Sequence, residues 1–206
     1  KKPMKKSALT TYVGYGHDDL PVADPELFEV GEGVFVSSSK TGGFLDTTGT
    51  LIRREGNTWF NSRTANMDYS NVEGGCVRTV FPLVDAVEVE NAAVEDVVLD
   101  GRAAENDRIN GCRGAAFYAY RSRRVMARRI VARDFHGDGF SFQTSDDVDL
   151  DSCVAEECRG HGFHPGSGSN RFHIHGCTAR RGEVCGLFYC LRVRDGILED
   201  CVFEDN

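Results

Sequence analysis

The sequence contains no long run of apolar residues. No hydrophobic stretch approaches the roughly 20 residues that a membrane-spanning helix needs, so a membrane is not expected as a partner. The opening residues, KKPMKK, lack the hydrophobic segment of a signal peptide, and a secreted protein would therefore have lost its signal already. Basic residues are not in excess either: the net charge is −8, and nucleic acid is not expected as a partner.

What the sequence does contain is a repeat in its second half. The centres of successive repeats fall at Phe117, Phe140, Phe163 and Leu187, separated by 23, 23 and 24 residues. Within each repeat, apolar residues alternate in short bursts separated by Gly, Asn, Asp or Ser, which indicates short strands joined by corners. The period leaves no room for a helix. Three strands per coil predict an all-β fold, a right-handed parallel β-helix.

Residues 1–80 do not share the repeat. Their segments FEVGEGVFV and GTLIRREGNTWF, and RTVFPLV after them, have the composition of strands, with Gly56-Asn57 as a hairpin turn. We expect a small N-terminal β cap over 1–80 and β-helix coils over 81–206. The sequence ends in the middle of a coil, so we expect either further C-terminal coils or a second chain that completes the β-helix.

The cysteines follow the repeat. Cys153, Cys177 and Cys201 recur every 24 residues, and Ile130 precedes the first of them by 23 residues. A column of this kind is typical of an apolar interior, so these thiols are expected to be structural and reduced. No Cys-x-x-Cys spacing suggests a zinc site, and the sequence leaves open whether any of the eight cysteines pair.

One outward face of the predicted coils carries side chains suited to chemistry. Imidazole and carboxylate groups transfer protons near neutral pH. The candidate catalytic residues on this face are Asp138, His161 and His164. The candidates for substrate contact on it are Tyr118, Tyr120, Gln143 and Phe188.

An insertion borders the same face. Val97 aligns with Ile130, a gap of 33 residues, so about ten extra residues lie in the segment GRAAENDRING. Insertions at coil corners often build binding walls, and a solvated loop without a ligand is the alternative. Candidates for substrate binding are Arg102 and Arg108 in the insertion and Arg192 in a later coil, and Asp107 is a candidate catalytic carboxylate.

The runs DGFSFQTS, GFHPGSGSNR and GLFYCLRVRDGILEDC resemble the right-handed β-helix superfamily of pectate lyases, polygalacturonases and other polysaccharide-active proteins. The resemblance covers residues 85–206. It implies a polysaccharide or oligosaccharide bound in a groove along the helix, a longer chain, and a secreted or periplasmic location. A homo-oligomer such as a trimer is a further expectation, because solenoids often associate side by side.

The signatures of individual enzyme families are incomplete. The four aspartates between residues 146 and 151 are expected to point in different directions, unlike the clustered calcium ligands of pectate lyases. No cofactor and no metal ligand is therefore predicted, with calcium as the alternative. Asp146-Asp147 and Gly160-His161-Gly162 echo polygalacturonases, but their Asn-x-Asp and Arg-x-Lys motifs are absent.

Three functions remain open at this point. The first is a lyase that cleaves a uronic-acid glycan by β-elimination, with His161 or His164 as the base and an arginine neutralising the substrate carboxylate. The second is a glycoside hydrolase or transglycosidase, which needs two carboxylates about 5 to 10 Å apart, such as Asp138 and Asp107. The third is a non-catalytic glycan-binding or fibre module.

Overall fold

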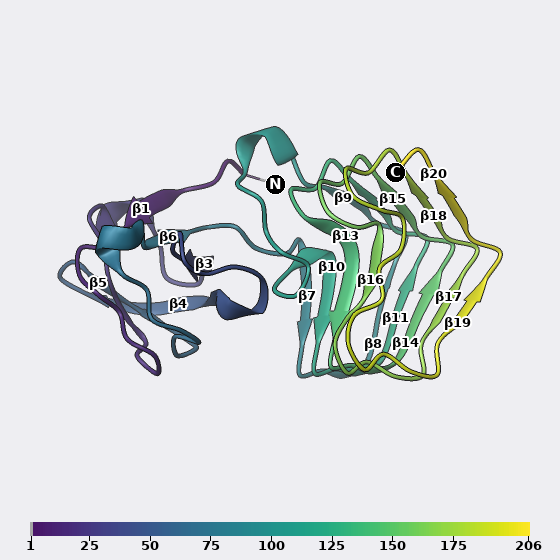
Figure 1. Ribbon diagram of the computed structural model, residues 1–206, viewed down its shortest axis with the longest axis horizontal. Helices are drawn as coiled ribbons and strands as arrows, with labels where there is room; N and C mark the ends of the chain where they lie inside the picture. The colour runs from purple at the N-terminus through teal and green to yellow at the C-terminus, as the bar shows by residue number, and fades with distance from the viewer. Residues whose placement is uncertain (1) are drawn as a thin grey trace. The chain divides into compact units, whose positions relative to one another are not determined.

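The repeat folds into coils of short strands stacked on one another. The computed structural model describes residues 2–206, and residues 82–206 form one of its two units. Within this unit, each strand pairs in parallel with its equivalents in the neighbouring coils (Figure 1). This arrangement is the parallel β-helix predicted from the period.

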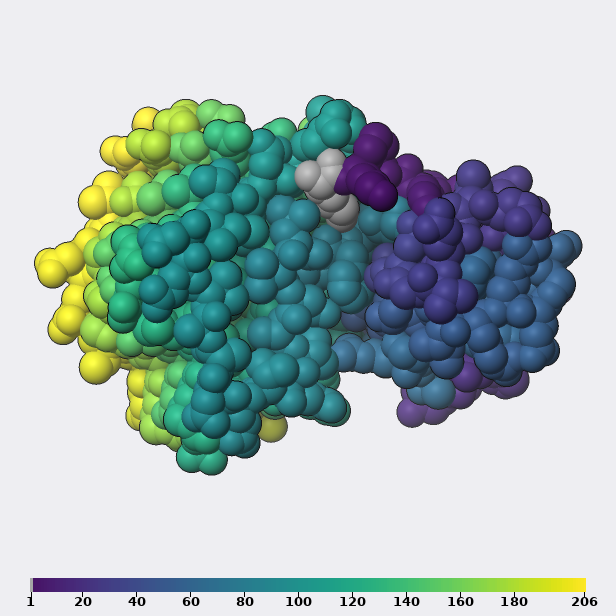
Figure 2. Space-filling model, turned by 180° about the vertical axis from the view of Figure 1, so that it is seen from behind, coloured from purple at the N-terminus to yellow at the C-terminus, as the bar shows by residue number. Residues whose placement is uncertain are grey.

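The described part of this unit contains three parallel sheets, and each coil contributes one strand to a sheet. The first sheet consists of β7 (Val84–Val87), β10 (Ala115–Tyr120), β13 (Asp138–Gln143) and β16 (Phe163–Pro165). The second consists of β8 (Glu90–Glu95), β11 (Arg123–Arg128), β14 (Asp146–Asp151), β17 (His173–His175) and β19 (Ile197–Glu199). The third consists of β9 (Val98–Asp100), β12 (Val131–Arg133), β15 (Val154–Glu156), β18 (Thr178–Arg180) and β20 (Val202–Glu204). On the surface, successive coils form bands that run from teal through green to yellow (Figure 2).

The strand register matches the predicted inward column. Phe117 pairs with Phe140, Phe140 pairs with Phe163, and Phe163 forms a bridge with Leu187. The ring centroid of Phe140 lies 6.0 Å from that of Phe117 and 5.1 Å from that of Phe163. All three rings are fully buried, so this aromatic ladder forms the centre of the core.

Two of the three column cysteines are confirmed as interior, whereas Cys201 in the last coil is only partly buried. Cys153 and Cys177 are fully buried, and the backbone N–H of Cys153 donates to Sγ of Cys177 at 3.3 Å. All eight cysteines are free thiols in the structure.

The corner between the second and third sheets bends through one residue per coil with positive φ. These residues are Asp96 (+57°), Arg129 (+50°), Ser152 (+53°), Gly176 (+61°) and Asp200 (+50°). The sequence pattern did not anticipate arginine here, because a left-handed conformation costs an L-residue about 1 to 2 kcal/mol. Arg129 donates to both carboxylate oxygens of Asp96, the corner residue of the preceding coil, at 2.6 and 2.8 Å. Charge pairing between corners therefore offsets part of the strain.

The other unit, residues 3–81, contains an antiparallel six-stranded sheet. Its described elements are β1 (Lys6–Ala8), β2 (Asp19–Pro21), β3 (Gly33–Ser37), β4 (Thr47–Glu55), β5 (Thr58–Asn61) and β6 (Cys76–Arg78), with the 3-10 helices η1 (Pro25–Leu27), η2 (Gly43–Leu45) and η3 (Asn71–Glu73). The predicted hairpin at Gly56-Asn57 joins β4 to β5. Trp59 and Tyr69 are buried in the hydrophobic core of this unit. The segment RTVFPLV is not one strand: β6 ends at Arg78, and β7 begins at Val84.

Among residues 2–206, no helix has both the length and the hydropathy that crossing a bilayer requires.

Candidate functional site

The insertion crosses the outward face of the first sheet. It comprises η4 (Ala103–Glu105) and the loop that follows to β10. The carbonyl oxygen of Gly111 accepts from Ser141 Oγ at 2.7 Å and from Gln143 Nε2 at 3.3 Å, and Tyr118 Oη donates to Cys112 O at 2.9 Å. Outward side chains of two successive coils thus hold the insertion against the sheet.

A cavity of about 310 Å³ lies between the insertion and the coils. Its lining combines one carboxylate, two imidazoles, a guanidinium, a thiol and an aromatic ring. These side chains are Arg108, Cys112, Asp138, His161, His164 and Phe188. The period brings Asp138, His161 and His164 together, because β13 carries Asp138 and the next coil places His164 on the adjacent strand β16 and His161 just before that strand.

Asp138 is the organising group of the cavity. It is 3% exposed, and its Oδ1 accepts from the backbone N–H of His161 at 2.8 Å. Its Oδ2 lies 2.7 Å from Nδ1 of His164. A Cβ atom at Gly111 or at Gly160 would overlap this carboxylate, so both positions require glycine for the close approach.

The two imidazoles have oppositely shifted pKa values. Burial is the largest influence on His164 and would lower its pKa, but the hydrogen bond and the negative charge of Asp138 outweigh it and raise the pKa. Burial lowers the pKa of His161; the charge of Asp138 opposes this shift, and the charges of His164 and Arg108 add to it, so the net shift is downward. The two ring centroids are only 5.4 Å apart. One imidazole therefore favours its protonated form and the other its neutral form.

The surroundings of the two imidazole rings differ: contacts with Phe188 and Cys185 orient His161, whereas one nitrogen of His164 faces the cavity lining without a hydrogen bond. The ring of His161 stacks on Phe188, with centroids 4.5 Å apart and an interplanar angle of 11°. Its Nδ1 lies 3.1 Å from Sγ of Cys185. Nε2 of His164 is buried, and no group among residues 2–206 meets the geometry of a hydrogen bond to it, although the thiol of Cys190 lies near the ring and helps to raise its pKa. A buried N–H of this kind is costly until an acceptor reaches it, so Nε2 is a natural point for a ligand oxygen.

Arg108 supplies positive charge at the edge of the cavity. Its guanidinium donates to the carbonyl oxygen of Arg159 and lies 3.9 Å from the carboxylate of Glu183. The side chain is half exposed, at 53%, and remains accessible to an anionic ligand. The prediction that Arg108 could bind substrate thus agrees with its position.

Other predicted site residues lie elsewhere. Tyr118 and Gln143 are each 4% exposed beneath the insertion, which leaves them no surface for direct contact with a substrate. They support the insertion instead. Phe188 does line the cavity, at the position predicted for it.

Four further candidates are not part of the cavity lining: Tyr120, Arg102, Asp107 and Arg192. Arg102 forms an ion pair with Glu105 within the insertion. Tyr120 stacks on Tyr118, and Arg121 lies over its ring. Arg192 is an exposed corner residue with a φ of +60°. Asp107 is half-buried in the insertion, two residues before Ile109, which does line the cavity.

The sequence interpretation missed the thiols near His164. Sγ of Cys190 lies 3.0 Å from Oγ of Ser167. Partial burial would raise the pKa of Cys190, but Ser167 and the nearby His164 outweigh it and lower the pKa. Burial raises the pKa of Cys112 to about 11 and that of Cys158 to about 12. The repeat does place Cys190 in the outward column of Tyr120 and Gln143, but nothing in that pattern singled out its thiol as a site residue.

These shifts predict an order of thiol reactivity. At neutral pH iodoacetamide should modify Cys190 at least about tenfold faster than Cys112, because the thiolate is the nucleophile and its larger population outweighs its weaker intrinsic nucleophilicity. Cys158, being fully buried, should react last. Peptide mass spectrometry of timed samples measures the order, and Cys158 reacting before Cys190 would contradict the assignment.

Comparison with known proteins gives one family match. The sequence model of the family described as "Right handed beta helix region" matches residues 88–206. No curated protein sequence matches the chain.

Among solved structures, the tailspike protein gp49 from Pseudomonas phage LKA1 is similar, with a TM-score of 0.36 and 16% identity over 97% of this chain and 39% of that one. The Gp54 tailspike of Acinetobacter baumannii bacteriophage AP22, solved with a capsular saccharide, has a TM-score of 0.37 and 11% identity, over 91% of this chain and 41% of that one. The catalytic domain of a GH87 alpha-1,3-glucanase in complex with nigerose has a TM-score of 0.33 and 8% identity, over 98% of this chain and 61% of that one. The chain thus spans about two fifths of the length of the tailspikes. At these values the matches assign it neither a substrate nor a reaction.

Proposed function

Because the chain belongs to the right-handed β-helix family, whose sequence model covers residues 88–206, we propose that its cavity binds a polysaccharide and cleaves it by proton transfer. The reaction that fits the lining best is β-elimination on a uronic-acid glycan. The observation that carries this proposal is the pair of imidazoles with opposite pKa shifts, 5.4 Å apart in one cavity. Groups whose environments move their pKa values apart are suited to act as acid and base in the same reaction.

In this reaction His161 is the base. Its pKa is lowered, so the ring is neutral at physiological pH and accepts the proton on the carbon beside the substrate carboxylate. Arg108 neutralises that carboxylate while the enolate forms. His164 carries a proton because Asp138 stabilises its charge, and its Nε2 donates that proton to the departing glycosidic oxygen.

The two-carboxylate mechanism of a glycoside hydrolase is less well supported. Among the described residues that line the cavity, Asp138 is the single carboxylate. Both of its oxygens accept hydrogen bonds, from His161 and His164. A second acid or base would have to come from outside this lining, and the predicted partner, Asp107, is not one of the lining residues.

The test is a panel of anionic and neutral polysaccharides digested with the whole protein and analysed by mass spectrometry. Elimination gives fragments lighter by one water than hydrolysis does, and an absorbance from the unsaturated uronate. His161→Asn should remove this product. The matched control is His17→Asn, because His17 is exposed and belongs to the other unit. Products of hydrolytic mass, or unsaturated products that His161→Asn leaves unchanged, would refute the proposal.

The opposite pKa shifts also predict the pH profile. The rate should rise with pH through the pKa of His161, which lies below the ordinary 6.5, because the base must lose its proton. It should fall at higher pH through the pKa of His164, which lies above 6.5, because the acid must keep its proton. Initial rates across a pH series should therefore form a bell with its maximum near neutrality, and a rate that still rises well above pH 8 would contradict the assignment.

A further inference from the structure

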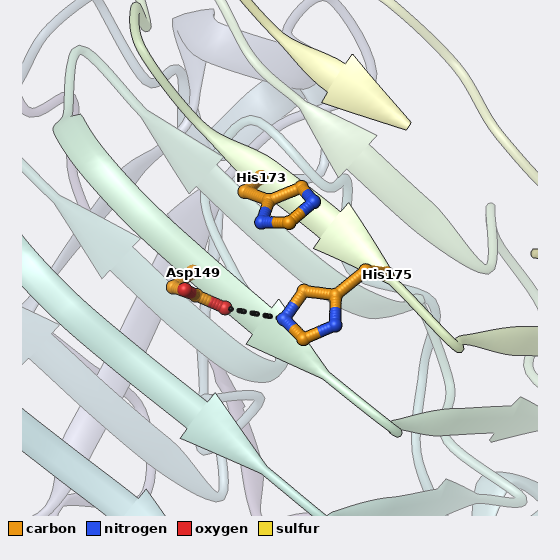
Figure 3. Close-up of side chains that lie close together, drawn as sticks. All are labelled: Asp149, His173 and His175. Atoms are coloured by element: carbon orange, nitrogen blue, oxygen red, sulfur yellow. Dashed lines mark hydrogen bonds and ion pairs between the residues drawn. The ribbon is translucent and has the colours of Figure 1, made fainter. Parts of the chain in front are cut away.

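A second cluster of chemically active side chains lies on the second sheet, away from the cavity. Asp149 is on β14, and His173 and His175 are on β17 of the next coil (Figure 3). Asp149 pairs with His173 in the parallel register, and His175 follows two residues later on the same face. Each of the three offers one ligand atom, and these atoms lie within 4.8 Å of one another.

We infer that Asp149, His173 and His175 bind one divalent transition-metal ion, with Zn²⁺ as the ion that fits best. Two imidazoles and one carboxylate form a three-ligand set with room for water at the remaining position. Imidazole nitrogen favours zinc and other transition metals, whereas calcium and magnesium prefer sites made of oxygen atoms alone. The site is independent of the proposed glycan cleavage, because none of its residues lines the cavity.

The ligand atoms of the three side chains need to move only slightly toward one another to bind a single zinc ion. Nε2 of His175 lies 3.2 Å from Oδ1 of Asp149, and the two imidazole rings stack with centroids 4.3 Å apart. Ligands at about 2.0 to 2.1 Å from a tetrahedral zinc ion are separated by about 3.3 Å. Because the side chains of His173 and His175 are 34% and 31% exposed, small rotations about their χ angles can close the site.

Neighbouring carboxylates already hold the far side of each ring. Asp151 Oδ1 lies 3.5 Å from Nδ1 of His175, while Nε2 of the same ring faces Asp149. Glu199 lies 3.1 Å from Nε2 of His173, so Nδ1 is the nitrogen that remains for a metal ion. Metal-binding histidines commonly bond a carboxylate through their second nitrogen, which fixes the ring and makes it a better ligand.

Metal binding would join two coils. Asp149 and the histidines belong to successive turns of the β-helix, so an ion bound by all three crosslinks their strands. An ion that binds the folded state and not the unfolded chain shifts the unfolding equilibrium toward the folded state. Zinc should therefore raise the temperature at which the β-helix unfolds.

The experiment is a calorimetric titration of the whole, untagged chain with Zn²⁺, Ca²⁺ and Mg²⁺ in a reductant that contains no thiol. We expect one zinc ion per chain and no comparable binding of calcium or magnesium. Loss of an outer carboxylate typically weakens metal binding by about 10- to 100-fold, so Asp151→Asn should fall in that range and His173→Gln or His175→Gln should lose at least about 100-fold. The matched control, His17→Gln, should bind zinc like the native chain.

Substitution with Co²⁺ identifies the donor atoms, because eight thiols are also present. Ligation by nitrogen and oxygen gives visible d–d bands without the near-ultraviolet charge-transfer band of a cobalt–thiolate bond. A thiolate band, an unchanged affinity in both β17 variants, or no zinc binding at micromolar concentration would overturn the inference. Circular dichroism of each variant verifies that it has folded.

Discussion

Replacing Asp138 with asparagine is expected to lower the rate of glycan cleavage by about 10⁴-fold, the loss seen when the carboxylate that orients a catalytic histidine becomes an amide. The amide keeps the size of the side chain but removes the charge that raises the pKa of His164. His164 then loses its proton at neutral pH and can no longer serve as the acid. Initial rates on the polysaccharide identified in the panel measure this effect.

The control for this substitution is Asp134→Asn. Asp134 lies in the same coil but does not line the cavity, so its variant should keep the native rate. A second readout does not depend on activity: the pKa of His164, followed by NMR, should fall in Asp138→Asn. If the rate falls while the pKa of His164 stays raised, Asp138 acts in some other way than by holding that proton.

The ion pair between Asp138 and His164 also makes the stability of the folded chain depend on pH. His164 has a raised pKa in the folded chain, so its ion pair with Asp138 contributes its full stabilisation below the unfolded value of about 6.5. This contribution is lost as the pH rises through the folded pKa. The difference in unfolding free energy between the native chain and Asp138→Asn should therefore be largest at mildly acidic pH and should become smaller at alkaline pH.

The period was sufficient to predict the coils and their register. In a parallel β-helix equivalent residues stack, so spacings of 23 and 24 residues translate directly into contacts such as Phe140 on Phe163. The same spacings predicted that Asp138, His161 and His164 lie on one outward face of the coils. They also relate Asp149 to His173, which is 24 residues later, but the aspartates of that segment were expected to diverge. Asp149 and Asp151 instead share a face, because strand residues two apart point the same way.

The path of the insertion could not be predicted, because it lies outside the repeat. Its ten extra residues were visible, but nothing in their sequence indicated that Gly111 would lie on the Asp138 carboxylate. For this reason Tyr118 and Gln143 were expected to contact a substrate, although they bond to the insertion and lie beneath it. Outward columns are predictable from the period, whereas their exposure depends on loops that follow no period.

The largest effect on stability is expected from Phe140→Ala. Phe140 is fully buried between the rings of Phe117 and Phe163, and removing a core phenylalanine leaves a cavity that costs about 3 to 5 kcal/mol. Each coil of a solenoid packs only on its neighbours, so a cavity in a central coil weakens the interfaces on both sides. Urea unfolding measures the loss, with a fluorescence or circular dichroism signal assigned to the β-helix.

The matched control is the same substitution at Phe203, which is 39% exposed and should cost clearly less. Equal losses at the two positions would show that the aromatic ladder is not the main source of stability. Phe140→Leu separates volume from aromaticity and should cost less than about 1.5 kcal/mol, because hydrophobic replacements of similar volume are tolerated best. Leu187 already occupies the equivalent position two coils later, so the column accepts leucine without a change in backbone register.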